Sequence, residues 1–192
     1  MSAFDNVMML MSFVYALAVA HILATVGDII GAWSRVRFSW LNASWMLFAF
    51  LAVFVWWVNL WDLRSQTVWT MGLVAIFFAM ASILYLEVRL VCARIPGEGA
   101  VDLVAFHKEA GRKYMAGFAV LAGFTELLNV FYWQRSDYAF VTRDPIDWAV
   151  FIQCIASIVA ASISNRRVQA AMTIVVGLVW VWFLFFLQSA FR

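Results

Sequence analysis

The chain of 192 residues is 66% hydrophobic and only 12% charged. Soluble domains average about 45–50% apolar and about 25% charged residues, so this composition excludes a protein with an ordinary water-facing surface. The formal net charge of +2 comes from 13 basic and 11 acidic residues with no basic block, which gives no indication of nucleic-acid binding. We therefore expect an all-α polytopic membrane helical bundle whose main partner is the lipid bilayer.

Six apolar stretches predict transmembrane helices, each close to the ~20 residues that cross about 30 Å of hydrocarbon. They lie at residues 7–31, 40–61, 67–90, 114–133, 146–163 and 168–190. Together they form a single transmembrane domain over residues 1–192. Asp5 precedes the first stretch without any Lys or Arg, so the basic region of a cleaved signal peptide is missing and we expect the first helix to remain in the mature protein.

The connection over residues 91–113 is the longest and is expected to have structure of its own. Leu103, Phe106 and Ala110 fall on one face of a helix, with charged residues elsewhere. This pattern is typical of a short helix on the cytoplasmic membrane surface. We expect that helix to continue into the fourth span.

The last two stretches differ in polarity. The fifth carries or borders four polar residues that favour a place inside the bundle, namely Gln153, Ser157, Ser162 and Ser164. The sixth contains the bulky segment VWVWFLFFL at residues 179–187. That segment predicts a surface that faces lipid or another subunit.

Basic residues, counted loop by loop on alternate sides, predict the orientation. One side has nine, which are Arg35, Arg37, Arg89, Arg94, Lys108, Arg112, Lys113, Arg166 and Arg167. The other side has four, which are Arg64, Arg135, Arg143 and Arg192. Positive residues are enriched on the cytoplasmic side, so both termini are predicted outside the cytoplasm, in a bacterial-type plasma (inner) membrane.

Ionisable residues inside the spans are the candidates for function. His21 lies near the middle of the first stretch, and Thr25 and Asp28 follow at i+4 and i+7 on the same helical stripe. Glu126 lies inside the fourth stretch with Asn129 at i+3. Charged groups in hydrocarbon are costly and face the bundle interior, a hydrated cavity or a partner. These five residues predict a polar path for protons, cations or a small cationic solute.

A structural role is the alternative for the same residues. Arg89 lies at the depth of Asp28, so the two predict an ion pair at the cytoplasmic rim. His21 and Glu126 would then serve as hydrogen-bonding groups between helices.

Cofactor and enzyme motifs are missing from the sequence. It has no Gly-x-Ser-x-Gly, no His-Glu-x-x-His and no phosphate-binding glycine loop, so we expect no enzyme. Cys92 and Cys154 fall at different depths, which predicts two free thiols and no metal site. His107 lies outside the spans, so a bis-histidine haem would require His21 from each of two subunits, and we predict no cofactor.

Three functional hypotheses remain. The first is a small channel or transporter, monomeric or homo-oligomeric, with Glu126 and His21 on its path. The second is a non-catalytic membrane scaffold or accessory subunit of a larger membrane complex, in which the buried charges only fix helix register. The third is a lipid- or quinone-binding protein with Trp-rich grooves at the outer rim.

Overall fold

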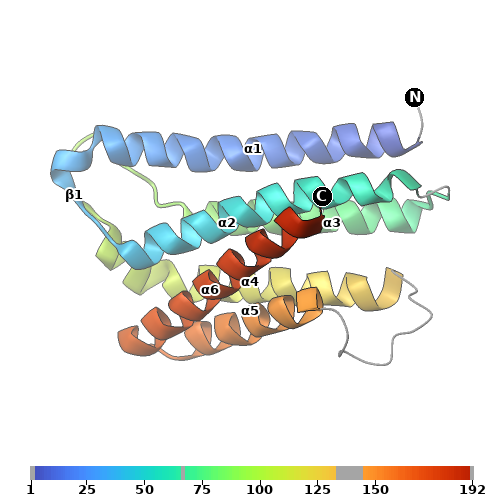
Figure 1. The fold of residues 1–192 in the computed structure, drawn as a ribbon. Coiled ribbons are helices and arrows are strands. Elements are labelled where there is room, and N and C mark those ends of the chain that lie inside the picture. Colours follow the sequence, from blue (N-terminus) through green and yellow to red (C-terminus); the bar gives the residue numbers. More distant parts are fainter. Residues whose placement is uncertain (1–2, 66–67, 133–144, 191–192) are drawn as a thin grey trace. The chain divides into compact units, whose positions relative to one another are not determined.

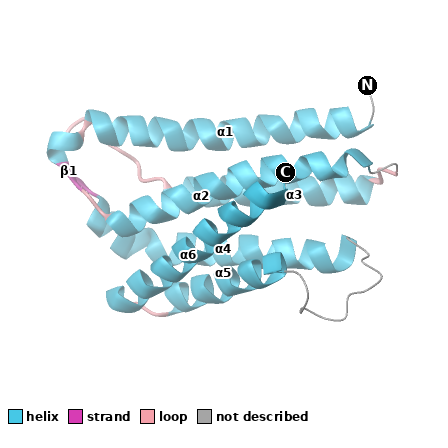
Figure 2. Ribbon diagram, in the orientation of Figure 1, coloured by secondary structure: helices cyan, strands magenta, loops and turns pink. Residues whose placement is uncertain are grey.

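The computed structural model describes residues 3–65, 68–132 and 145–190, and these ranges are almost entirely helical (Figure 2). Six α-helices follow one another in this part of the chain (Figure 1). They are α1 (Ala3–Gly31), α2 (Trp40–Asn59), α3 (Met71–Val91), α4 (Leu103–Tyr132), α5 (Pro145–Ser162) and α6 (Arg166–Ala190). The expected all-helical architecture is confirmed. The chain divides into two compact units, residues 1–108 and 109–192, with the boundary inside α4.

Four helices are long and apolar enough to cross a membrane, judged over the described residues. Their apolar ranges are Phe4–Gly31, Trp40–Asn59, Met71–Val91 and Arg166–Phe185. A shorter apolar helical stretch, Trp148–Ser162, belongs to α5. Length and composition therefore support a membrane-embedded protein.

In the first unit, α1, α2 and α3 pack on one another (Figure 1). Local sequence sets the starts of two of these helices. Ser39 before α2 and Thr70 before α3 each accept a hydrogen bond from the backbone amide three residues further on. Such side chains satisfy amides that have no partner inside the helix. The Thr70 cap explains why α3 begins at Met71, four residues after the predicted start.

The predicted surface helix and the predicted fourth span form one continuous element. α4 runs from Leu103 to Tyr132 over 30 residues. The expected continuation of the segment before residue 114 into the fourth span is therefore confirmed.

Two short strands join the connections that follow α1 and α3, and the sequence did not predict them. β1 (Val36–Arg37) and β2 (Val101–Asp102) pair in parallel, with Val36 opposite Val101. The two connections follow α1 and α3, which run in the same direction (Figure 1). Strands of two residues are too short to show an alternating pattern of hydrophobicity.

Arg35 fastens the second of these connections to the first. It ends the 3₁₀ helix η1 (Trp33–Arg35), and its Nη2 donates to the carbonyls of Pro96 at 3.0 Å and Gly97 at 2.9 Å. Its Nη1 donates to the carbonyl of Gly99. Gly99 has φ +89°, a conformation that glycine adopts without strain. One guanidinium thus fixes three carbonyls of the α3–α4 connection.

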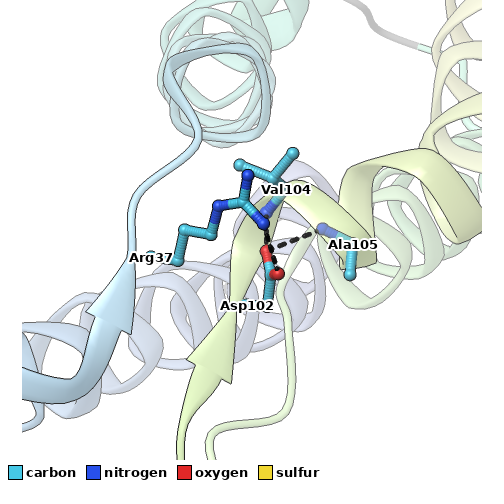
Figure 3. Close-up of polar contacts among 4 residues, drawn as sticks. All are labelled: Arg37, Asp102, Val104 and Ala105. Atoms are coloured by element: carbon cyan, nitrogen blue, oxygen red, sulfur yellow. Dashed lines mark hydrogen bonds and ion pairs between the residues drawn. The ribbon is translucent and has the colours of Figure 1, made fainter.

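Asp102 makes a second link between the same connections (Figure 3). Its Oδ2 lies 3.1 Å from Nη1 of Arg37, and its Oδ1 accepts the amides of Val104 and Ala105, both at 2.9 Å. The hydrogen bond from Ala105, with further contributions from Arg37 and Val104, holds the pKa of Asp102 below its ordinary value. An ionised carboxylate at this place caps the N-terminus of α4 and interacts favourably with the positive end of the helix dipole.

In the second unit, α5 and α6 pack on one another, and side chains satisfy the carbonyls at the end of α5. Nε2 of Gln169 donates to the carbonyl of Ala160 at 3.3 Å, and Nε of Arg112 donates to that of Ala161 at 2.7 Å. These carbonyls belong to the last turn of the helix and have no partner within it. The contacts therefore tie α6 and α4 to the C-terminal end of α5.

The polar residues of the fifth predicted span separate into two pairs. Gln153 and Ser157 are buried, as expected for side chains that face the interior. Ser162 and Ser164 are exposed because they lie at and beyond the end of α5. The buried pair alone carries the polar face of this helix.

The bulky segment of α6 is divided between two faces. Trp180 and Phe183 are buried, three residues apart on one face. The exposed large side chains in the described part of this segment, residues 179–185, are Val181, Trp182 and Phe185. The outward surface expected over residues 179–187 is therefore not continuous over residues 179–185, because Trp180 and Phe183 point inward. The side chains at positions 186 and 187 lie outside the described part of the structure.

Candidate functional site

Buried polar side chains of the first unit gather where α1 and α3 end and α2 begins. α1, α2 and α3 contribute Thr25, Asn42 and Glu87, whose exposed fractions are 5%, 0% and 1%. Cys92, directly after α3, is also buried. We call these four residues the polar cluster. Buried polar groups are costly unless they find hydrogen-bond partners, so the partners of each member decide what the cluster can do.

Glu87 lies on the most buried stripe of α3. At spacings of three and four residues the stripe also contains Phe77, Met80, Leu84 and Val91, which are at most 3% exposed. Neither carboxyl oxygen of Glu87 has a hydrogen-bond partner within the described residues. A buried carboxylate without a cation or donor costs several kcal/mol. This group therefore requires a proton or a cation.

Asn42 reaches the C-terminal end of α3 from α2. Its Nδ2 donates to the carbonyl of Val91 at 2.9 Å, and Val91 lies one helical turn beyond Glu87. This bond sets the orientation of the amide, because Oδ1 in the same place would face another acceptor. Oδ1 is buried and has no donor in the part of the chain that the structure describes. Asn42 and Glu87 thus leave three buried acceptor oxygens unsatisfied.

Within the polar cluster, Thr25 of α1 lies beside Cys92, the residue that follows α3. The Thr25 hydroxyl donates to the carbonyl of His21 at 2.9 Å. Burial raises the pKa of the Cys92 thiol, while a hydrogen bond with Thr25 and the charge of Arg89 lower it. The charge of Glu87 raises that pKa further, which places the carboxyl group within electrostatic range of the thiol. The net effect is a neutral thiol at neutral pH.

Arg89 and His21 form a second contact between α3 and α1. Nη1 of Arg89 lies 3.4 Å from Nδ1 and 3.3 Å from Nε2 of the imidazole. A guanidinium has donors only, so a neutral imidazole accepts the bond through whichever nitrogen carries no hydrogen. His21 is half-buried and Arg89 is exposed. The contact brings a cation and a neutral ring together at the side of the polar cluster.

The ion pair expected between Asp28 and Arg89 is not formed in the described structure, where the salt bridge is the one between Arg37 and Asp102. Asp28 is exposed. It lies seven residues beyond His21, about 10 Å along α1 at about 1.5 Å per residue. Helical side chains lean toward the N-terminus, and this direction carries the long Arg89 side chain toward His21 and away from Asp28.

The predicted candidates of the fourth span belong to the second unit, whereas His21, Thr25 and Asp28 belong to the first. Glu126 is half-buried in α4 and interacts electrostatically with Cys154 of α5. The Cys154 thiol donates to the carbonyl of Ala119 at 3.6 Å. Asn129 lies in α4, but its side chain is outside the described part of the structure. α4 and α5 thus bring a carboxyl group and a thiol together.

Both cysteines are free thiols. No group of three His, Cys, Asp or Glu side chains that could hold a metal ion occurs among residues 3–65, 68–132 and 145–190. The chemistry available at the polar cluster and the adjoining contact of His21 with Arg89 is therefore that of oxygen acceptors, one thiol, one imidazole and one guanidinium.

Sequence reasoning included His21 and Thr25 but missed Asn42 and gave Glu87 no role. The signal for Glu87 was present, because an acidic residue replaces an apolar one at a position of the apolar 3–4 repeat of α3. Asn42 carried no comparable signal, since its position three residues after Ser39 equally suits the first turn of a helix.

Comparison of this chain with protein-family models, curated protein sequences and solved structures finds no match.

Proposed function

We propose that the protein is an integral membrane protein with six spanning helices that passes protons or small cations along a polar path. The observation that carries this proposal is Glu87, a carboxyl group with 1% exposure and no hydrogen-bond partner among the described residues. Such a group is costly unless a cation or proton joins it, and intramembrane ionisable residues mark ion and proton pathways. A site that takes up a positive charge inside a membrane helix is the basic element of such a pathway.

The neighbouring side chains support a path rather than an isolated site. His21 and Thr25 lie four residues apart on α1, about 6 Å along its axis. Thr25 adjoins Cys92, which lies in the electrostatic field of Glu87. His21 in turn contacts Arg89 on α3. Polar groups thus follow one another along the contact between α1 and α3.

Two additional spans in α4 and α5, beside the four long apolar helices, complete the proposed topology. The excess of basic residues on one side, nine against four, supports termini outside the cytoplasm. Reporter fusions at the two ends test this topology, since a reporter that is active only outside the cytoplasm should be active at both. Activity at one end only would contradict an even number of spans.

The function is tested by flux into proteoliposomes made with purified protein. Wild-type protein should carry protons, sodium or potassium above protein-free vesicles, and Glu87→Gln should reduce that flux at least tenfold. Glu98→Gln is the matched control, because the same substitution is made at an exposed residue of the α3–α4 connection. Glu126→Gln tests the contribution of the second unit in the same assay.

Background flux from folded wild-type protein for all three ions would overturn the proposal. The protein would then be better described as a non-catalytic scaffold or accessory subunit. In that function Glu87 would only fix the register of α3 against its neighbours, as buried polar groups do in some helical assemblies.

A further inference from the structure

We infer that Arg89 and His21 bind the phosphate group of an anionic lipid beside the C-terminal end of α3, on the surface that α1 and α3 share. This inference goes beyond the proposed function, because it concerns a bound lipid and no transported ion. The two side chains carry a positive charge and have more hydrogen-bond donors than acceptors, and a lipid phosphate supplies what they lack.

The contact between these side chains leaves donors without acceptors. Nη1 of Arg89 lies 3.4 Å from Nδ1 and 3.3 Å from Nε2 of His21, so it faces both ring nitrogens at nearly the same distance. One of these nitrogens carries a hydrogen in either neutral tautomer, and a guanidinium has N–H donors only. The single acceptor of the ring therefore satisfies one donor of Arg89, and the remaining N–H groups of both side chains require acceptors from elsewhere.

The positive charge of Arg89 has no acidic partner in the part of the chain that the structure describes, where the salt bridge is made by other residues. Glu87 lies on the buried stripe of α3, about 200° around the helix from Arg89 at about 3.6 residues per turn. Asp28 lies about 10 Å beyond His21 along α1, which exceeds the Debye length of about 8 Å at physiological ionic strength. A ligand with negative charge and acceptor oxygens therefore suits this position.

The site lies close to the boundary of the hydrocarbon. α3 has 21 residues, about 31 Å of helix, which matches a hydrocarbon core of about 30 Å. Arg89 is two residues, about 3 Å, from the last residue of α3. Thr25 lies beside Cys92, directly after α3, so His21 is one helical turn inside this boundary. A long basic side chain at this depth reaches the headgroup layer.

Exposed apolar side chains adjoin the site on the side of the bilayer centre. Arg89 itself is exposed. Leu86, three residues before Arg89 on α3, is 58% exposed, and Leu17, four residues before His21 on α1, is 61% exposed. At these spacings each leucine lies on the same side of its helix as the polar residue. A phospholipid fits this order, with its phosphate at the guanidinium and its acyl chains against the leucines.

The chemistry of the two side chains favours an anionic phospholipid. The planar guanidinium binds phosphate oxygens through two parallel hydrogen bonds, and the imidazole N–H adds another donor. The proposed topology places this end of α3 at the cytoplasmic leaflet, where anionic lipids are found and where basic pockets between membrane helices bind their headgroups. A soluble anion would leave the exposed leucines without a contact.

Native mass spectrometry of the purified protein in detergent, titrated with phosphatidylglycerol or phosphatidylcholine, tests the inference. Wild-type protein should bind the first phosphatidylglycerol molecule more tightly than the first phosphatidylcholine molecule. Arg89→Gln should weaken phosphatidylglycerol binding about tenfold or more, because it removes a charge-assisted contact. Arg94→Gln is the matched control, since it changes another exposed arginine just after α3, and it should bind like wild-type protein.

The contribution of His21 is tested in the same titrations. His21→Phe keeps an aromatic ring but removes the N–H donor, so binding should weaken by less than in Arg89→Gln. His21→Gln keeps an N–H donor and should bind more tightly than His21→Phe. If Arg89→Gln does not fold, Arg89→Lys keeps the charge without the planar fork, and binding should again be weaker than in wild-type protein.

Three results would overturn the inference. One is equal phosphatidylglycerol binding by wild-type protein and a folded Arg89 variant, or an equal loss in Arg94→Gln. Another is equal binding of the two lipids by wild-type protein. The third is displacement of phosphatidylglycerol by millimolar inorganic phosphate, which would identify a site for the free anion. The flux assay is independent, since selective lipid binding without flux would leave the inference intact and overturn the proposed function. Flux without selective lipid binding would do the reverse.

Discussion

Gly99 is the position where the conformation of the α3–α4 connection gives the clearest prediction. Its φ of +89° is accessible to glycine, whereas an L-residue with a side chain pays about 1–2 kcal/mol in the left-handed region. A Cβ at this position would meet nothing within 4 Å, so a steric clash adds nothing to this cost. Alanine also restricts the unfolded chain, which offsets about 0.4–1 kcal/mol. We expect Gly99→Ala to lower the free energy of unfolding by about 1 kcal/mol.

Gly97→Ala is the matched control for this change. Gly97 also accepts a hydrogen bond from Arg35, and a Cβ there would again meet nothing within 4 Å. Its φ lies outside the positive region, so the unfolded-state effect should dominate and stabilise the protein by about 0.4–1 kcal/mol. The two substitutions should therefore change the free energy of unfolding in opposite directions, and the two variants should differ in it by about 1–2 kcal/mol.

The assay for this pair is denaturant unfolding in detergent micelles, followed by tryptophan fluorescence and fitted with a common slope. The reasoning would be refuted by equal changes in the two variants, or by a stabilising effect of Gly99→Ala. Either result would mean that residue 99 does not adopt the left-handed conformation in the folded protein. The connection would then reach Arg35 by another route.

Three further substitutions test other parts of the structure. Glu87→Leu should leave the free energy of unfolding unchanged or raise it, because it removes a buried acid. The same substitution should abolish flux. A decrease of more than about 2 kcal/mol in the free energy of unfolding would contradict the stability expectation. Asp102 has a lowered pKa in the folded state, so its contribution to stability is complete above its ordinary pKa of about 4 and is lost as pH falls through the folded value. Wild-type protein should therefore be more stable than Asp102→Asn by a constant amount between about pH 5 and 7, and that difference should shrink under more acidic conditions, in unfolding curves measured across pH. Arg112→Ala should cost about 0.5–1.5 kcal/mol through the hydrogen bond to Ala161, whereas Lys113→Ala, at an exposed neighbour on α4, should be neutral in the same assay.

The helices were predictable because their signals are local. Apolar stretches of spanning length fixed the positions of all six, and the pattern after residue 102 predicted that α4 extends beyond its apolar part. Where the predicted start of a helix differs from the observed one, the cause is local. The cap by Thr70, for example, makes α3 begin at Met71 instead of residue 67. The strands β1 and β2 had no such signal, because their pairing depends on two connections that are 65 residues apart.

The contact between Arg89 and His21 shows where charge matching by depth fails. Spacing correctly placed His21, Thr25 and Asp28 on one stripe of α1, and opposite charge at equal depth then suggested Asp28 as the partner of Arg89. Depth was judged from the Cα position, whereas a contact depends on where the side chain ends. A long side chain that leans toward the N-terminus meets a residue about two turns earlier on a parallel neighbour.

Glu87 and Asp28 together show what distinguishes a candidate functional acid from an ordinary one in such a helix. Both lie near the ends of apolar helices, but Asp28 is exposed, while Glu87 interrupts the stripe that runs from Phe77 to Val91 at spacings of three and four. An exposed acid at a helix end keeps its contact with water or headgroups and needs no partner from the protein. An acid within the buried stripe has no contact with water or headgroups, so its charge must be compensated by a proton or a bound cation. Position on the buried stripe is therefore a better guide than depth along the helix, and it points to Glu87 rather than Asp28 as the residue to mutate first.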